Sequence, residues 1–113
     1  MRIAAAGFEI PNNLTKVQRT LWNLREDMKL GNVLGDHDRY LSAQRAFMKE
    51  FVAHPKDGLT LPPTARFTAP LFSRTGLNML KVLIKELFRK RTPEEKELGI
   101  KMKEIMQNRR YYV

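Results

Sequence analysis

Apolar side chains recur at intervals of three or four residues along four stretches of this chain, and this spacing limits its possible folds more than any other feature. Such intervals place side chains on one face of an α-helix. The clearest row consists of Leu14, Val17, Leu21, Leu24 and Met28. No stretch has a convincing strand pattern of alternating apolar and polar residues. The sequence therefore predicts one all-α domain with helices at residues 13–30, 36–54, 71–91 and 92–107.

The first two predicted helices are separated by a short loop, which makes them antiparallel neighbours. The second helix carries its own apolar row, Tyr40, Ala43, Phe47 and Phe51. We expect Phe47 and Phe51 to lie buried between the two helices. The residues that they are expected to face are Val17, Leu21 and Leu24. The third and fourth helices are expected to make a second helical pair.

Capping residues set the expected ends of the first hairpin. Asn12 or Asn13 can accept a hydrogen bond from the first amides of the first helix, and Gly31 suits a left-handed residue at its end. Asp36 or Asp38 can cap the second helix.

The start of the fourth helix is the best-defined local signal. Thr92 can cap it, Pro93 fits the first helical position, and Glu95 stands where a capping box needs an acidic residue.

Residues 55–70 interrupt the helical pattern and are expected to connect the two pairs. The segment is punctuated by Pro55, Gly58, Pro62, Pro63 and Pro70. A structureless connection of this length is unusual inside a compact domain. Leu59, Leu61 and Phe67 indicate an extended segment laid across a surface, such as that of a partner. The single domain then spans residues 1–113, with an extended N-terminus and a basic tail at 108–113.

Positive charge is concentrated in the second half of the chain. Lys and Arg number 21 against 12 Asp and Glu, a formal net charge of +9, and residues 59–113 hold 12 of the basic but 5 of the acidic side chains. A field of this sign attracts nucleic acid, anionic lipid or an acidic protein. Two tyrosines in the tail could stack on exposed bases. The side chains expected to contact RNA or another anionic partner are Lys81, Lys85, Arg89, Lys90, Arg91, Arg109, Arg110, Tyr111 and Tyr112.

The residues needed for catalysis or metal binding are not present in a recognisable arrangement. The chain has no cysteine, and its two histidines, His37 and His54, are too far apart to be helical neighbours. There is no phosphate-binding loop, dinucleotide fingerprint or nucleophile elbow. No uncharged apolar run approaches the roughly 20 residues of a membrane span. We therefore expect no enzymatic activity, no metal site, no cofactor and no transmembrane segment.

A pattern of arginine and aromatic residues runs through residues 14–54. The basic amphipathic run at 37–51 ends in an aromatic pair, and either Phe47 or Phe51 could be its functional phenylalanine. The preceding helix contains Val17-Gln18-Arg19. This pattern resembles the Leu-Tyr-Arg (LYR) superfamily of small, basic, helical mitochondrial proteins, in which a first-helix Leu-Tyr-Arg precedes a second-helix Phe. The chain matches that tripeptide in the arginine and in an aliphatic residue.

Members of that family serve as subunits or assembly factors of respiratory complexes and mitoribosomes. Many bind acyl carrier protein, whose acyl chain enters the helical core, so the resemblance implies acyl carrier protein as a candidate partner. The partner-binding residues expected in the first two helices are Arg19, Arg25, Arg39, Tyr40, Arg45, Phe47 and Phe51.

Charge, composition and resemblance together lead to one functional expectation and one alternative. The first is a noncatalytic subunit or assembly factor of a large mitochondrial complex (a respiratory complex, ATP synthase or the mitoribosome), in the matrix or on the matrix face of the inner membrane. The alternative is a basic helical RNA-binding or ribosomal protein that acts through its third and fourth helices.

Overall fold

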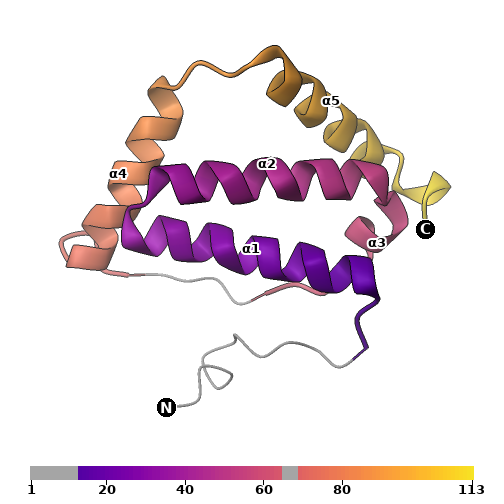
Figure 1. Ribbon diagram of the computed structural model, residues 1–113, viewed down its shortest axis with the longest axis horizontal. Coiled ribbons are helices and arrows are strands. Elements are labelled where there is room, and N and C mark those ends of the chain that lie inside the picture. The colour runs from indigo at the N-terminus through magenta and orange to yellow at the C-terminus, as the bar shows by residue number, and fades with distance from the viewer. Residues whose placement is uncertain (1–12, 65–68) are drawn as a thin grey trace.

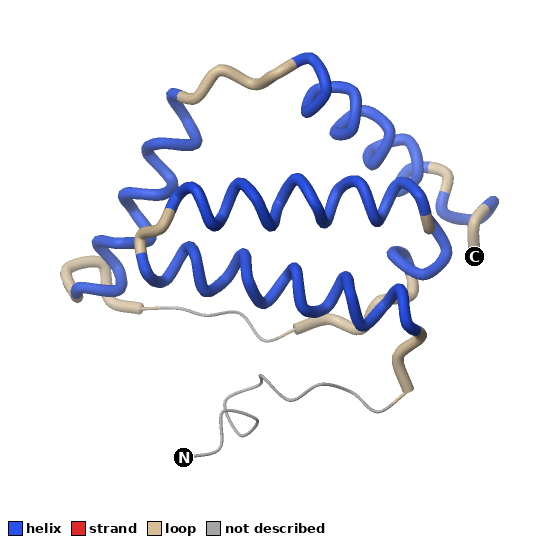
Figure 2. Tube along the Cα trace, viewed as in Figure 1, coloured by secondary structure: helices blue, strands red, loops and turns tan. Residues whose placement is uncertain are grey.

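Two antiparallel helices, α1 (Lys16–Leu34) and α2 (His37–Ala53), form a hairpin on which the later helices pack (Figure 1). The computed structural model describes residues 13–64 and 69–113. The elements that follow the hairpin are α3 (Pro55–Leu59), α4 (Arg74–Phe88), α5 (Pro93–Gln107) and the short 3-10 helix η2 (Arg109–Tyr111). Only helix and loop occur in these described parts (Figure 2). The prediction of an all-α domain is therefore confirmed.

The start of α1 differs from the prediction. Its N-cap is Thr15, whose Oγ1 accepts a hydrogen bond from the Gln18 amide at 3.1 Å. The Gln18 side chain in turn accepts from the Thr15 amide at 3.2 Å, which closes a capping box. Asn13 is therefore not the cap, and Asn12 lies outside the described residues.

The end of α1 also differs, because Gly31 lies inside the helix and Gly35 ends it. Gly35 has a φ of 71°, the left-handed conformation of a C-terminal glycine. Gly31 has a different role, since a Cβ placed there would lie 2.8 Å from the backbone nitrogen of Tyr40. The absence of a side chain at this position allows the backbones of α1 and α2 to approach closely.

The second helix begins at one of its two predicted caps, Asp36 and Asp38. Asp36 is its N-cap and accepts from the Arg39 amide at 3.1 Å. The helix ends at Ala53, next to the expected end at His54.

The connector has more structure than its prolines indicated. Its first residues form α3, and residues 60–64 then run back along α1. Gln18 donates to the Thr60 hydroxyl at 2.9 Å, and Arg25 donates to the Pro62 carbonyl at 2.6 Å. Leu59 and Leu61 pack against the core of this chain rather than a partner's surface. The third apolar residue of the prediction, Phe67, lies outside the described residues.

Both helices of the second half are present, but they pack on the hairpin more than on each other. α4 packs on α1 and α5 packs on α2. Figure 1 shows them leaning away from each other toward opposite ends of the hairpin, joined by a short link. Thr92 caps α5 as predicted, and its Oγ1 accepts from the Glu95 amide at 3.2 Å. The Glu95 carboxylate does not close the expected capping box, because it points to two arginines instead.

The core lies where α1, α2 and α5 meet. Leu21, Phe51 and Ile105 form its buried cluster. Phe51 is 4% exposed, which confirms its expected burial against the first helix. Phe47 is only partly buried, with its ring centroid 6.1 Å from that of Phe51. Gly58 of α3 lies against the Phe51 ring so closely that a Cβ there would approach it to 2.4 Å.

Truncation of Phe51 tests this core. Phe51→Ala should lower the free energy of unfolding by about 3–5 kcal/mol, the usual cost of emptying a buried phenylalanine site. Phe72, which is 88% exposed, supplies the matched control. Phe72→Ala should change that free energy by less than about 0.5 kcal/mol. Denaturant unfolding followed by circular dichroism measures both, and equal effects would contradict the assignment of Phe51 to the core.

Removal of the α5 cap is a second test. Thr92→Ala should destabilise the protein by roughly 0.5–2 kcal/mol, since the Glu95 amide loses its acceptor. Thr92→Ser keeps an oxygen at that position and should retain most of the stability. Amide hydrogen exchange across residues 94–98 should accelerate in the alanine variant alone. Unchanged exchange in that variant would show that Thr92 is not the cap.

Candidate interaction surfaces

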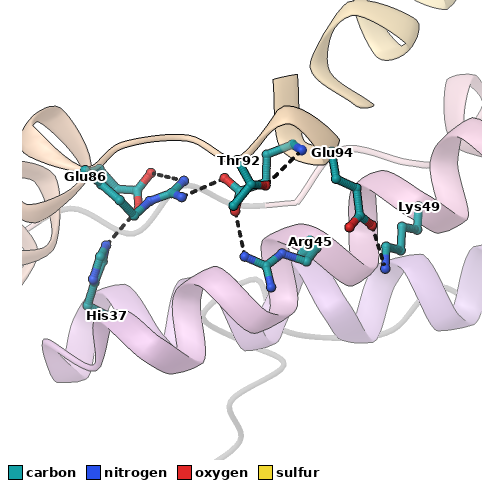
Figure 3. A network of polar contacts seen from close by, with 8 residues as sticks. His37, Arg45, Lys49, Glu86, Thr92 and Glu94 are labelled. Carbon is teal, nitrogen blue, oxygen red and sulfur yellow. Dashed lines mark hydrogen bonds and ion pairs between the residues drawn. The ribbon is translucent and has the colours of Figure 1, made fainter. Parts of the chain in front are cut away.

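A nearly buried carboxylate, Glu95 at the start of α5, connects three parts of the fold. Its side chain is 8% exposed. Arg45 of α2 donates to one carboxylate oxygen at 2.6 Å, and Arg89 of the link donates to the other at 2.6 Å (Figure 3). Two guanidinium groups therefore compensate the cost of removing this charge from water.

A second carboxylate, Glu86, extends these contacts to the end of α4. Arg89 Nε donates to Glu86 Oε1 at 3.0 Å, and His37 Nε2 lies 2.8 Å from the same oxygen (Figure 3). The continuous series His37, Glu86, Arg89, Glu95 and Arg45, which we call the ion-pair network, fixes both α4 and α5 to α2.

The network keeps both carboxylates ionised. Hydrogen bonds from Arg89 and then Arg45 lower the pKa of Glu95 below its ordinary value. Burial alone would raise the pKa of Glu86, but hydrogen bonds from Arg89 and His37 outweigh it and lower that pKa as well. The same two carboxylates raise the pKa of Arg89.

The outer side of α4 is apolar and exposed. Phe88 is 84% and Leu87 is 72% exposed, whereas Val82 on the opposite side of the helix is buried. We call the exposed apolar set the α4 face, and its members are Leu71, Phe72, Leu77, Leu83, Ile84, Leu87 and Phe88. Large exposed apolar side chains gathered along one helix of a small protein are typical of an interaction site.

An open groove of about 680 Å³ lies beside the α4 face, between α4 and α2. Tyr40 and Gln44 line it from α2, and Leu80 and Leu83 line it from α4. Arg91 of the link also borders the groove. Burial, and to a smaller extent the charge of Glu86, raises the pKa of Tyr40, so its hydroxyl stays protonated in the groove at neutral pH.

The far end of α5 and the tail present a second exposed area. Its side chains, which we call the C-terminal surface, are Ile100, Met106, Arg109, Arg110, Tyr111, Tyr112 and Val113. Arg109 reaches the Leu59 carbonyl only at 3.5 Å, the outer limit of a hydrogen bond. The C-terminal surface thus combines apolar and cationic groups at the other end of α5 from the ion-pair network.

Several of the predicted partner-binding residues make contacts within the chain. Arg25 lies 4.7 Å above the ring of Trp22, and burial lowers its pKa. Arg39 pairs with Asp27 at 2.6 Å. Arg45 belongs to the ion-pair network and Phe51 to the core, so these residues have structural roles in the isolated chain.

The remaining predicted residues are distributed over different surfaces. Arg19 is exposed on α1, whereas Tyr40 lines the groove and Phe47 is half-buried beside the core. Of the predicted basic residues of α4 and the link, those exposed are Lys81, Lys85, Lys90 and Arg91. Arg89 differs from them, because its guanidinium bridges Glu86 and Glu95.

Two features of the site were absent from the sequence prediction, although each left a signal. Glu86 and Arg89 have the spacing of a helical ion pair, which indicates a local contact. The apolar positions of α4 also occupy a wider arc than one buried stripe needs, which indicates a second exposed apolar side.

No family model, no curated protein and no solved structure matches this chain. Within residues 13–64 and 69–113, none of the helices has the length and apolarity needed to cross a bilayer. The same described residues contain no group of three or more side chains placed to hold a metal ion.

The ion-pair network predicts a pH-dependent contribution to stability. The pKa of Glu95 is lower in the folded state than in the unfolded chain, where it is about 4.3. The ionised carboxylate therefore contributes fully to the free energy of unfolding above that unfolded-state pKa, and this contribution is lost as pH falls through the folded-state pKa. Glu95→Gln should therefore cost about 1–3 kcal/mol at neutral pH. Below about pH 4, the free energies of unfolding of the Glu95→Gln variant and of the unmodified chain should become more similar.

The neighbouring residue Glu94 provides the control. It pairs with Lys49 at 3.0 Å, but both side chains are exposed. Glu94→Gln should cost less than about 0.5 kcal/mol at any of these pH values. Denaturant titrations at neutral and acidic pH measure both variants, and equal losses for the two would exclude a special role for Glu95.

Proposed function

We propose that this chain is a noncatalytic helical subunit or assembly factor of a large mitochondrial complex, in the matrix or on the matrix face of the inner membrane. The observation that carries the proposal is the imbalance between its core and its surface. The buried large apolar side chains are few, whereas the exposed ones include most of the outer side of α4 and the end of α5. Such surfaces gain stability when a partner covers them.

The C-terminal surface is the area that we assign to protein partners. It combines the exposed Met106 at the end of α5 with the two arginines that follow the helix, so that apolar contact and positive charge act together. Interfaces favour methionine, arginine and tyrosine for the same physical reasons, because these side chains combine contact area with a polar group. The neighbouring subunit would have to present an apolar patch with acidic residues around it.

The two basic clusters support a bridging role. Lys90 and Arg91 precede α5, and Arg109 and Arg110 follow it. A helix of 15 residues separates the clusters by about 22 Å. Two separated cationic anchors suit a subunit that contacts two neighbours better than they suit one compact binding site.

The mitochondrial setting is supported by the resemblance of residues 14–54 to LYR proteins. That resemblance also keeps acyl carrier protein as a candidate partner. Arg19, the arginine of Val17-Gln18-Arg19, is exposed in the fold. A partner of that kind could therefore contact the chain at this position.

One observation favours RNA binding as the second candidate function. The tail surrounds a shallow hollow of about 470 Å³, lined by Arg109, Arg110 and Tyr111 among others. An exposed tyrosine between cationic side chains can stack on a base while the arginines contact phosphate. Binding of that kind should weaken by orders of magnitude over a few-fold rise in salt.

Charge reversal tests the assembly role. A tagged chain is expressed in its parent cells, mitochondria are isolated, and the native complexes are separated by size. Lys90→Glu with Arg91→Glu, and Arg109→Glu with Arg110→Glu, should each reduce the fraction of the chain in large particles several-fold. Neither pair should change the stability of the isolated protein by more than about 0.5 kcal/mol per exposed site.

Two exposed basic residues outside these clusters supply the control, Lys16→Glu with Arg74→Glu, which should incorporate normally. Full incorporation of both reversed pairs would contradict the bridging role. Release of the particles by nuclease would support the RNA-binding alternative instead.

A further inference from the structure

Most of the α4 face is open to solvent, although Leu71, Leu83 and Leu87 also line the groove between α4 and α2. α4 packs on α1 through its inner side, which includes Val82 and Asn78. The Asn78 side chain donates to the Val33 carbonyl at 3.2 Å, and this bond fixes the rotation of the helix about its own axis. With the inner side fixed, Leu77, Ile84 and Phe88 lie exposed on the outer side of the helix. The amphipathic pattern of α4 is therefore only partly used by the fold.

The outward side of α4 has cations at its margin and no exposed carboxylate. Lys81 and Lys85 are exposed one helical turn apart, and Lys90 and Arg91 follow the helix. The acidic residue of α4 is Glu86, whose side chain is 13% exposed and is directed inward to the ion-pair network. An apolar strip with a purely cationic margin complements a surface that is apolar below and anionic above.

The position and shape of the α4 face decide between possible partners. Figure 1 shows α4 at one edge of the molecule, lying across the end of the hairpin. Phe72 and Phe88, near the two ends of the helix, project into solvent rather than line the groove. A deformable planar surface can surround all of these projecting side chains at once. A second copy of the chain would bring two cationic margins together, which its net charge of +9 opposes.

We propose that α4 lies in the surface of an anionic lipid bilayer, with the α4 face inserted among the acyl chains and Lys81 and Lys85 at the headgroups. The long lysine side chains reach the headgroup level while their methylene groups stay in the apolar layer. The helix is about 22 Å long and would lie parallel to the membrane plane. This placement goes beyond the assembly role, because it assigns a membrane to the α4 face, whereas the C-terminal surface is the one assigned to protein partners.

Vesicle binding tests this placement on the full chain. The probes are vesicles of phosphatidylcholine alone and of phosphatidylcholine mixed equally with phosphatidylglycerol, and cosedimentation measures the partition coefficient. The protein should bind the anionic vesicles and bind the neutral ones far more weakly. Leu87→Ser with Phe88→Ser should reduce the partition coefficient roughly tenfold or more. Lys81→Gln and Lys85→Gln should each reduce it about fivefold.

The matched controls come from α5, which carries exposed side chains of the same kinds. Ile100→Ser with Met106→Ser should leave vesicle binding unchanged, as should Lys101→Gln with Lys103→Gln. Circular dichroism of each variant checks that the helical content is retained. The α5 variants change the surface assigned to protein partners, whereas the α4 variants change the surface assigned to the membrane. A failure of the assembly role can therefore be distinguished from a failure of membrane binding.

A second measurement does not rely on loss of binding. The chain has no cysteine, so one introduced cysteine carries an environment-sensitive dye uniquely. A dye at Ile84→Cys, which lies on the α4 face and outside the groove, should show a blue shift in emission with anionic vesicles, whereas a dye at Met106→Cys should not. The proposal is overturned by absence of binding to anionic vesicles, by equal binding of the α4 and α5 variants, or by equal shifts at the two dye positions. Self-association or capture of an acidic protein that requires Leu87 and Phe88, in place of vesicle binding, would also overturn it.

Discussion

The arrangement of this protein depends on the burial of the Glu95 carboxylate between two arginines. α4 and α5 pack on different helices of the hairpin and make few contacts with each other, so apolar packing alone does not fix the link between them. Arg89, in that link, is held by a carboxylate from each helix, and Arg45 fixes the whole group to α2. A buried carboxylate is tolerated only where its partners are well placed, which makes this contact specific as well as stabilising.

The sequence was sufficient to predict those features that depend on residues close together in the chain. Helical spacing located the helices, and the short side chains of Asp36 and Thr92 marked two helix starts correctly. The errors at α1 have local causes too. Thr15 and Gln18 form a capping box, so α1 begins there and not at the asparagines before it. Gly31 allows the two helices to approach closely and does not end the helix.

Other features depend on contacts between distant residues, which one sequence does not reveal. The bond between Arg45 and Glu95 joins residues far apart in the chain, and nothing near either position indicates its partner. The position of residues 60–64 also depends on distant contacts. The prolines of this segment indicated a loose connector, whereas in the structure it accepts hydrogen bonds from side chains of α1. Periodicity likewise shows that α4 has an apolar side without showing which way that side is turned. For this reason the basic residues of the helix could be identified in advance, whereas the direction in which the α4 face is turned could not.

The contact of Arg25 with Trp22 has a practical consequence. Trp22 is the only tryptophan of the chain and is almost completely buried. The guanidinium above its ring is held in place by the Pro62 carbonyl, so the environment of the indole depends on whether residues 60–64 are seated along α1. Intrinsic fluorescence therefore reports on the attachment of this segment. The protein thus contains an internal optical probe that can follow the opening of its connector separately from the events at its surfaces.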